Sequence, residues 1–378
     1  MKKVALLIET SRSFGRQLIM GIAGYSKLHG PWSFYKEPTD IKSSMPHLAN
    51  WKPDGIIARD FLISDELLQL NIPVIVSVHK AKIPEKLPII KTDNQAVAKM
   101  ASEHFLEKGL KNLAFCGYDH FYWSNERGSY FSSFNNEAGY QTYDYRQKEA
   151  LIKSKWEVEQ QLVSDWINGL PKPVGIFACN DDRAQHILEV CKILNLKVPE
   201  DVSVVGVDND PLICNLSDPP LSSIVLNNKL AGYKAAELLD KMINKKTVAV
   251  ENIIVSPSHI IQRQSSDGLA INDPDVSQAI FYIRQNAKNK ILVNDVVKST
   301  KLNRRTLERR FKQQINRTIY EEIRRARIEL ISKMLIETNM SITEISSFFN
   351  FTDTEHISRY FKLEKRIGPR QFRKLYRP

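Results

Sequence analysis

The sequence predicts an α/β region with a parallel sheet, followed by an all-α region that contains two helix-turn-helix units. Three observations predict this fold class. Short apolar runs alternate with helical patterns over residues 1–263, the basic excess lies in residues 276–378, and that second region repeats one turn-and-helix pattern. With 378 residues, the chain is long enough for two or three domains.

Residues 1–263 carry short apolar runs separated by longer amphipathic segments. Runs that are apolar at nearly every position are typical of parallel strands covered on both faces. We expect such strands at Val4–Ile8, Gly55–Ala58, Val74–Val78, Leu113–Cys116, Gly175–Cys179 and Ser203–Val207. Apolar residues spaced three and four apart predict helices at Asn94–Lys108, Trp156–Asn168 and Arg183–Leu194. Strands and helices in alternation indicate an α/β domain.

Polar residues follow several of these strands, and parallel sheets bind ligands beyond the carboxyl ends of their strands. Asp181 and Asp208 each follow a predicted strand directly or within two residues. A carboxylate can accept hydrogen bonds from two hydroxyls, and arginine and aromatic side chains would complete a sugar site. The alternative is that both residues only cap the following helix or turn. The candidate ligand-binding residues are Ser13, Phe14, Arg16, Arg59, Trp123, Arg127, Asp181 and Asp208.

Signatures of common enzyme classes do not occur in the sequence, which has no GxGxxG after a strand, no Walker loop and no GxSxG elbow. Its four cysteines form no CxxC pair and there is no HExxH motif, so we expect reduced thiols and neither a metal nor a cofactor. No apolar run approaches the ~18–20 residues of a membrane span, and no signal peptide is recognisable. We therefore expect a cytoplasmic protein that is not an enzyme.

Two strings in this region carry a family resemblance. They are ACNDDRA at residues 178–184 and VPEDVSVVGVD at residues 198–208. At this separation they resemble the effector domain of LacI/GalR-type repressors, which is similar to periplasmic sugar-binding proteins. The resemblance implies two α/β lobes that close on a ligand. It also implies that Asp181 and Asp208 contact sugar hydroxyls and that Arg127 lies between the lobes.

The charge of the chain is distributed unevenly between the two regions. Residues 276–378 contain 23 basic and 10 acidic residues, a net charge of +13, whereas the first 275 residues have a net charge of −2. The basic region is also rich in Ile, Leu and Phe, so we expect it to fold rather than form a solvated tail. This asymmetry indicates a nucleic-acid-binding module joined to a neutral domain. Turn-forming residues predict a linker at 264–275 between them.

A first helix-turn-helix unit is predicted at residues 293–314. The turn falls at residues 301–302, and Asn303 can cap the second helix, which begins at Arg304. Apolar residues four apart define the buried face of that helix. The residues on its other faces that could contact phosphates or guanines are Arg304, Arg305 and Arg309.

A second unit is predicted at residues 341–364, joined to the first by a helix over about 319–337. Ser341 and Glu344 form a capping box, and Asn350 marks the turn because asparagine tolerates the left-handed conformation. The outward candidates on the following helix are Glu355, His356 and Arg359. The alternative for both units is a generic helical bundle with arginines on its solvated face.

The order of motifs over residues 276–378 resembles the AraC/XylS DNA-binding domain. The matching strings include LERRFK at residues 307–312 and SITEI at residues 341–345. The chain departs from the family at four positions that are usually glycine, namely Lys301, Asn316, Asn350 and Arg366. The resemblance implies that each unit places one helix on double-stranded DNA.

An AraC/XylS-type domain behind a LacI/GalR-type sensor resembles the regulators of xylose operons. The resemblance implies a sugar-sensing domain at 1–263, a linker at 264–275 and a DNA-binding domain at 276–378. We expect a homodimeric activator of pentose (xylose-like) utilisation genes that binds promoter DNA and a small sugar, with RNA polymerase as a further candidate partner. Two alternatives stay open, namely an α/β enzyme acting on a small polyol or sugar with a DNA-binding appendage, and a ligand-independent DNA-binding protein.

Overall fold

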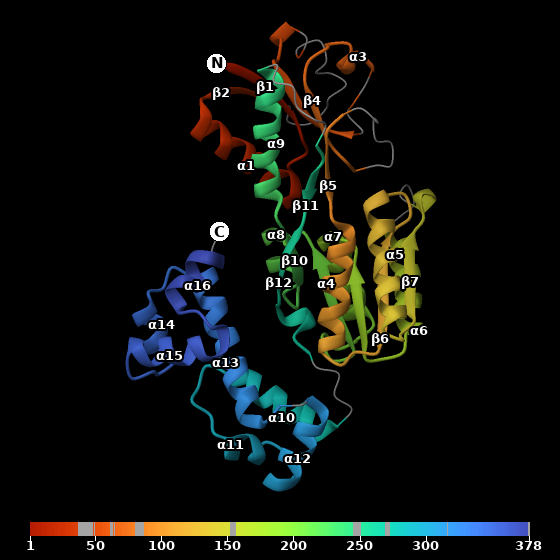
Figure 1. The fold of residues 1–378 in the computed structure, drawn as a ribbon. Helices are drawn as coiled ribbons and strands as arrows, with labels where there is room; N and C mark the ends of the chain where they lie inside the picture. The colour runs from red at the N-terminus through yellow and green to blue at the C-terminus, as the bar shows by residue number, and fades with distance from the viewer. Residues whose placement is uncertain are drawn as a thin grey trace. The chain divides into compact units, whose positions relative to one another are not determined.

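The computed structural model describes residues 1–36, 48, 50–60, 63, 65–79, 87–151, 156–244, 251–268, 273–315 and 317–376 (Figure 1). The chain divides into two compact units, Met1–Gly268 and Leu269–Pro378. The predicted fold class is confirmed, because the first unit is α/β with two largely parallel sheets and the second is entirely helical where it is described.

The first lobe is built on a parallel sheet with strand order β11-β5-β4-β3-β1-β2. Its strands are β1 (Lys2–Leu7), β2 (Trp32–Lys36), β3 (Gly55–Arg59), β4 (Val74–Ser77), β5 (Ile89–Thr92) and β11 (Ile253–Val255). The helices of this lobe are α1 (Ser13–His29), α3 (Asp65–Leu68) and α9 (Asn228–Ile243). Although α1 and α9 are far apart in the sequence, they lie side by side (Figure 1).

The second lobe is built on a sheet with strand order β12-β10-β9-β8-β6-β7, in which only β12 runs antiparallel to its neighbour. Its strands are β6 (Asn112–Tyr118), β7 (Thr142–Gln147), β8 (Val174–Ala178), β9 (Val202–Val207), β10 (Ser222–Leu226) and β12 (Pro257–Ile261). Its helices are α4 (Asn94–Glu107), α5 (Tyr122–Glu137), α6 (Trp156–Gly169), α7 (Asp181–Ile193) and α8 (Pro211–Leu216).

The chain crosses between the lobes after β5, after β10 and after β11, so each lobe is assembled from segments distant in the sequence. All six predicted strands are present, with ends shifted by one or two residues. Strands that the sequence did not predict include β7, which lies at the edge of its sheet. Its sequence TYDYRQ is largely polar and only half-buried, so it lacks the continuous apolar run of a central strand.

The second unit contains two helix-turn-helix modules, each with its own core. Its helices are α10 (Pro274–Gln285), α11 (Val293–Lys298), α12 (Arg304–Ile315), α13 (Ile319–Glu337), α14 (Ile342–Phe348), α15 (Thr354–Lys365) and α16 (Pro369–Tyr376). Phe311 of α12 lies in the first core and Phe361 of α15 in the second. The linking helix α13 contributes to both cores, with Ile323 in the first and Leu335 in the second.

The predicted caps of these helices are present. Asn303 accepts a hydrogen bond from the Thr306 N–H at 2.9 Å, and Ser341 and Glu344 bond to each other's backbone N–H. Asn350 has the expected left-handed backbone, with φ of 54°. Among the other positions that depart from the family's glycines, Asn316 lies outside the described residues.

The structure differs from the predicted linker 264–275 at both of its ends. Ser265 and Ser266 are fully buried in the second lobe, where the Ser265 hydroxyl donates to the Val204 carbonyl at 2.7 Å. At the other end, Asp273 caps α10, which begins at Pro274. Turn-forming residues occur in loops, in helix caps and in short 3₁₀ turns such as Gln264–Ser266. Their presence here therefore did not distinguish a loop from a cap or a 3₁₀ turn.

Replacing Arg366 by glycine should stabilise the second unit by up to about 1 kcal/mol. Arg366 ends α15 in the left-handed conformation, with φ of 60°, which costs a non-glycine residue free energy. Urea unfolding of the full chain measures the change. The matched control is Lys365→Gly, one residue earlier within the right-handed helix, which should instead destabilise by about 1 kcal/mol. Equal destabilisation by both substitutions would contradict the prediction.

Candidate functional site

Asp208 lies at the junction of the two lobes, in an unusual backbone conformation just beyond β9. Its φ of 101° is rare for any residue other than glycine, and such strain concentrates at functional positions. Burial raises the pKa of its carboxyl to about 6, although the nearby guanidiniums of Arg127 and Arg59 lower it. In the described part of the chain, no group donates a hydrogen bond to this carboxylate. Asp208 is therefore an acceptor held in place without a protein donor.

The two guanidiniums that interact with Asp208 come from different lobes. Arg59 ends β3 of the first lobe, and Arg127 lies on α5 of the second. Both side chains are buried, and burial lowers the pKa of each. Arg127 is held by the Asn94 Oδ1 at 2.9 Å and by the Cys179 carbonyl at 2.5 Å. A ligand seated beside Asp208 would consequently meet cationic donors from both lobes.

Aromatic faces accompany both arginines. The Arg59 guanidinium lies 4.5 Å from the ring centre of Phe14, and the Arg127 guanidinium lies 4.9 Å from that of Trp123. Trp123 stacks on Phe121 with ring centres 5.5 Å apart, and His79 from the first lobe lies 4.7 Å from Phe121. The structure thus brings together five of the eight predicted ligand-binding residues, namely Phe14, Arg59, Trp123, Arg127 and Asp208.

Two buried donors at this junction lack hydrogen-bond partners among the described residues. They are the Nε of Arg59 and the indole Nε1 of Trp123. Buried polar atoms are almost always paired in folded proteins, so unpaired donors at one junction indicate a place for a ligand or for ordered water. Together with the Asp208 carboxylate, they provide the donors and acceptors that a polyhydroxylated molecule requires.

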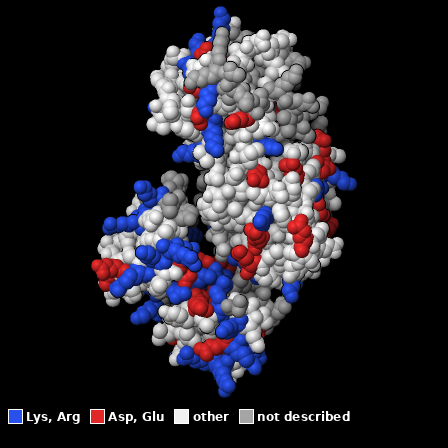
Figure 2. Space-filling view, in the orientation of Figure 1, with Lys and Arg blue, Asp and Glu red and all other residues white. Residues whose placement is uncertain are grey.

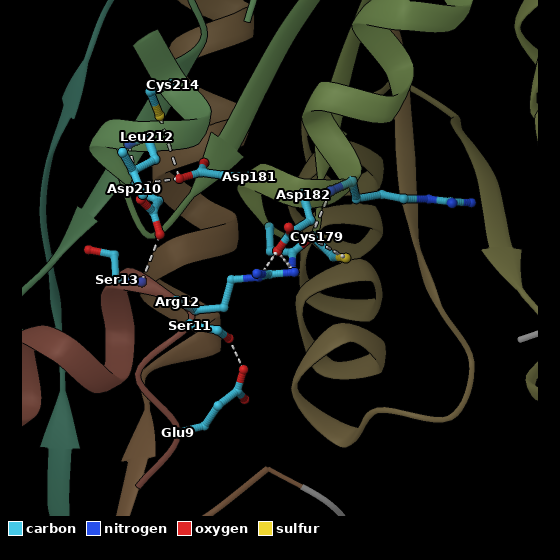
Figure 3. A network of polar contacts seen from close by, with 12 residues as sticks. Glu9, Ser11, Arg12, Ser13, Cys179, Asp181, Asp182, Asp210, Leu212 and Cys214 are labelled. Atoms are coloured by element: carbon cyan, nitrogen blue, oxygen red, sulfur yellow. Dashed lines mark hydrogen bonds and ion pairs between the residues drawn. The ribbon is translucent and has the colours of Figure 1, made fainter. Parts of the chain in front are cut away.

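Asp181 has a different environment, because protein groups engage both of its carboxylate oxygens. Figure 3 shows the contact with Asp210. The Ser223 hydroxyl donates to Oδ1 at 2.5 Å, and the Asp210 backbone N–H donates to Oδ2 at 2.7 Å. Gly206 leaves the space for this carboxylate, since a Cβ there would lie 2.4 Å from Oδ1. Burial raises the pKa of Asp181 well above its ordinary value. In this structure Asp181 positions the turn after β9 instead of presenting a free carboxylate.

Arg16 and Ser13 are likewise engaged by protein groups. The Arg16 guanidinium donates to the Thr10 and Ser11 carbonyls and to Asp210 at 2.7 Å. The backbone N–H of Ser13 donates to the same Asp210 oxygen at 2.8 Å. Both residues therefore join the lobes to each other, which differs from the ligand contacts expected of them from their place after the first strand.

The sequence pattern predicts no contact between the lobes for Asp210, or for the nearby pair of Arg12 and Asp182. The Arg12 Nε donates to the Asp182 carboxylate at 2.7 Å across the lobes (Figure 3). The available signal was the presence of two acidic residues after each of two strands, Asp181 with Asp182 and Asp208 with Asp210. In each pair, one residue contacts the opposite lobe through a direct hydrogen bond.

Exposed cations gather on the first helix-turn-helix module of the second unit, and Figure 2 shows Lys and Arg concentrated over this unit on the visible face. Arg304, Arg305 and Arg309 are all exposed on α12. Arg304 forms hydrogen bonds with Glu308 and Asn294, whereas Arg305 and Arg309 form none within the described residues. These arginines line a groove between α12 and the start of α13 together with Lys312 and the exposed Tyr320.

The corresponding helix of the second module is α15. Glu355, His356 and Arg359 are exposed on it, as the sequence predicts. The His356 ring is oriented by Thr352, whose hydroxyl lies 3.1 Å from Nδ1, and by Phe351, whose ring centre is 5.0 Å away. Arg359 has no hydrogen-bond partner in the part of the chain that the structure describes. Each module therefore presents unpaired arginine on the helix that follows its turn.

Within the described residues, no helix is both long and apolar enough to cross a membrane.

Three family models match consecutive parts of the chain. A XylR N-terminal domain matches residues 3–95, a periplasmic binding protein-like domain matches residues 102–266, and a helix-turn-helix domain matches residues 296–375. The first two models lie within the first unit and the third lies within the second unit.

Relatives similar along nearly the whole chain are named xylose operon regulatory proteins. The one from Haemophilus influenzae is 35% identical over 380 residues, which cover 98% of this chain and 98% of the relative. The one from Escherichia coli K12 is 32% identical over 380 residues, covering 98% and 96%. A solved structure described as the xylose-binding transcription activator XylR is 31% identical, with a TM-score of 0.70 and coverage of 100% and 98%. A LacI-type regulator from Alkaliphilus metalliredigens, complexed with D-xylulofuranose, is 24% identical over 70% of this chain with a TM-score of 0.57, which shows the fold alone.

Proposed function

Because this chain belongs to the family of xylose operon regulatory proteins, we propose that its effector is D-xylose, bound between the two lobes of the first unit. The chain is a sugar-responsive, DNA-binding transcription regulator. The observation that carries the proposal is the Asp208 carboxylate, which accepts no hydrogen bond from the residues that the structure describes and interacts with one buried guanidinium from each lobe.

Asp208 accepts hydrogen bonds from two neighbouring sugar hydroxyls, and Arg59 and Arg127 donate to other sugar oxygens. The rings of Phe14 and Trp123 cover the C–H faces of the sugar. A ligand shifts an equilibrium between open and closed lobes only through its difference in affinity for the two arrangements. Contacts from both lobes supply that difference, because the open arrangement separates Arg59 from Asp208. In this proposal Ser13, Arg16 and Asp181 support the site without touching the sugar.

The second unit binds promoter DNA through α12 and α15. The candidate contacts are Arg304, Arg305, Arg309, Glu355, His356 and Arg359. The linking helix α13 has 19 residues, so it spans about 28 Å at 1.5 Å per residue. This length is of the order of one turn of DNA, ~34 Å, which would let the two helices enter successive major grooves.

The active form is a homodimer in which sugar binding changes the spacing of the two DNA-binding units. The sensor, expected at residues 1–263, corresponds to the first unit, Met1–Gly268, and the DNA-binding domain, expected at 276–378, corresponds to the second unit, whose helix α10 begins at Pro274. The protein acts in the cytoplasm as an activator, with RNA polymerase as its partner at the promoter, and binds its sugar without transforming it. The relatives that match the whole chain are named as regulators, which favours this role over an enzymatic one.

D-xylose should stabilise the full chain and change its affinity for promoter DNA. A ligand at a hundred times its dissociation constant stabilises by about 2.7 kcal/mol, which thermal unfolding detects readily. The matched control is L-xylose, which has the same composition and the opposite chirality. The proposal fails if D-xylose produces neither heat in calorimetry nor a change in DNA affinity by fluorescence anisotropy.

A further inference from the structure

Three hydrogen-bond donors of the first lobe contact two carboxylates of the second, apart from the proposed sugar ligands. The donors are Arg12, the Ser13 N–H and Arg16, and the acceptors are Asp182 and Asp210. Figure 3 shows the contacts of Arg12 and of Ser13. We name these five residues the interlobe latch. They lie 170–197 residues apart in the sequence, so they meet only when the lobes are together.

Asp210 is the central residue of the latch, and it is held rigidly in its own lobe. One carboxylate oxygen of Asp210 caps α8 by accepting a hydrogen bond from the Leu212 N–H at 3.1 Å. The backbone N–H of Asp210 donates to the Asp181 carboxylate. The other oxygen accepts from both Ser13 and Arg16 of the first lobe. The Asp210 side chain is only 4% exposed, so this charged contact is shielded from solvent.

The first-lobe side of the latch is also held in position by contacts within its own lobe. Two backbone carbonyls of the loop after β1 hold the Arg16 guanidinium, so it keeps its orientation when the lobes separate. The contact between Arg12 and Asp182 is more open, with side chains 53% and 27% exposed, and water weakens it. The latch therefore consists of a strong, buried contact at Asp210, the inner arm, and a weak, solvent-exposed contact at Asp182, the outer arm.

We propose that the interlobe latch stabilises the closed arrangement of the lobes without sugar and so sets the apparent affinity for the effector. None of its hydrogen bonds needs a ligand, so it favours closure in the free and in the bound chain alike. The apparent dissociation constant equals the intrinsic one divided by the fraction of competent closed molecules. Residues that never touch the sugar thereby set the sugar concentration to which the regulator responds. This inference rests on the proposed function only in that the effector binds between the lobes.

The inner arm is tested by Asp210→Asn in the full chain. Asparagine is a good helix cap, so α8 keeps its cap while the charge facing Arg16 is lost. We expect the apparent dissociation constant for D-xylose to rise about three- to tenfold, because a smaller fraction of the ligand-free molecules is closed. The matched control is Asp165→Asn, an exposed aspartate on α6 of the same lobe, which should leave the affinity unchanged.

Lobe closure is measured directly by energy transfer between dyes on Lys27→Cys in the first lobe and Asn136→Cys in the second. Both positions are exposed, whereas the four native cysteines are buried and resist labelling. Without sugar, Asp210→Asn should shift molecules from the short to the long dye distance. At saturating D-xylose, the variant and the native chain should show the same short distance.

A charge exchange keeps the test independent of folding defects. Arg12→Asp and Asp182→Arg should each open the ligand-free lobes by repulsion, and the double exchange should restore closure. Unchanged ligand-free distances in Asp210→Asn, or no rescue in the double exchange, would overturn the proposal. Failure of D-xylose to bind the native chain would refute the proposed effector instead. The dye distances without sugar would still show whether the latch stabilises the closed lobes.

Discussion

Replacing Asp208 by asparagine should weaken D-xylose binding about ten- to a hundredfold. Hydrogen bonds to a buried charged group contribute about 1.5–3 kcal/mol, and 1.4 kcal/mol corresponds to a tenfold change in affinity. Asparagine has nearly the same shape, but its amide accepts at only one atom and does not compensate Arg59 and Arg127. Calorimetry on the full chain measures the loss. Asp165→Asn, which removes an exposed charge from the same lobe, should bind as the native chain does. Equal affinities for Asp208→Asn and the native chain would remove Asp208 from the site.

The same carboxylate should make sugar binding depend on pH. Burial raises the pKa of Asp208 to about 6, so its carboxylate is protonated in a growing fraction of molecules below that pH. Only the ionised form accepts from two hydroxyls, and affinity should therefore fall about tenfold between pH 7.5 and pH 5. In Asp208→Asn this dependence should disappear. Parallel pH profiles in the two proteins would show that another group controls binding.

Loss of one arginine from each of the helices α12 and α15 should weaken promoter binding at least about thirtyfold. Arg305 and Arg359 lie exposed on α12 and α15, and within the described residues no protein group pairs with them. Each base contact removed costs about 1–3 kcal/mol and relaxes specificity at one position. A phosphate contact would instead weaken all sequences alike and make the salt dependence shallower. Fluorescence anisotropy with promoter and scrambled DNA duplexes separates these outcomes. It is measured on Arg305→Ala and Arg359→Ala singly and on the double variant.

The matched control for this experiment is Arg310→Ala. Arg310 lies on the same helix as Arg305, but its guanidinium pairs with Asp273 at 3.2 Å, so it faces the start of α10. This variant loses the same type of charge and should change DNA affinity far less. If all three alanine substitutions had the same effect, overall charge rather than α12 and α15 would account for binding.

Local sequence patterns were sufficient to predict the division into an α/β sensor and a basic helical unit, and most of the central strands. These features depend on neighbours along the chain. A continuous apolar run favours a buried strand whatever packs on it, and a Ser341–Glu344 capping box starts a helix from its own side chains. Asn350 marked its turn for the same local reason. Edge strands such as β7 escaped prediction because half of their surface faces solvent and permits polar residues.

The different roles of the acidic residues after β8 and β9 follow from their tertiary contacts. Asp181, Asp182, Asp208 and Asp210 have the same carboxylate chemistry, and nothing in their sequence spacing distinguishes them. Their roles follow from partners in distant segments, since Asp181 meets Ser223, Asp182 meets Arg12, and Asp210 meets Ser13 and Arg16. Of the four, Asp208 alone accepts no side-chain hydrogen bond within the described residues, and its carboxylate interacts with two guanidiniums. A side chain's function is set by what packs against it, and those contacts form only once the three crossings between the lobes bring the strand ends together.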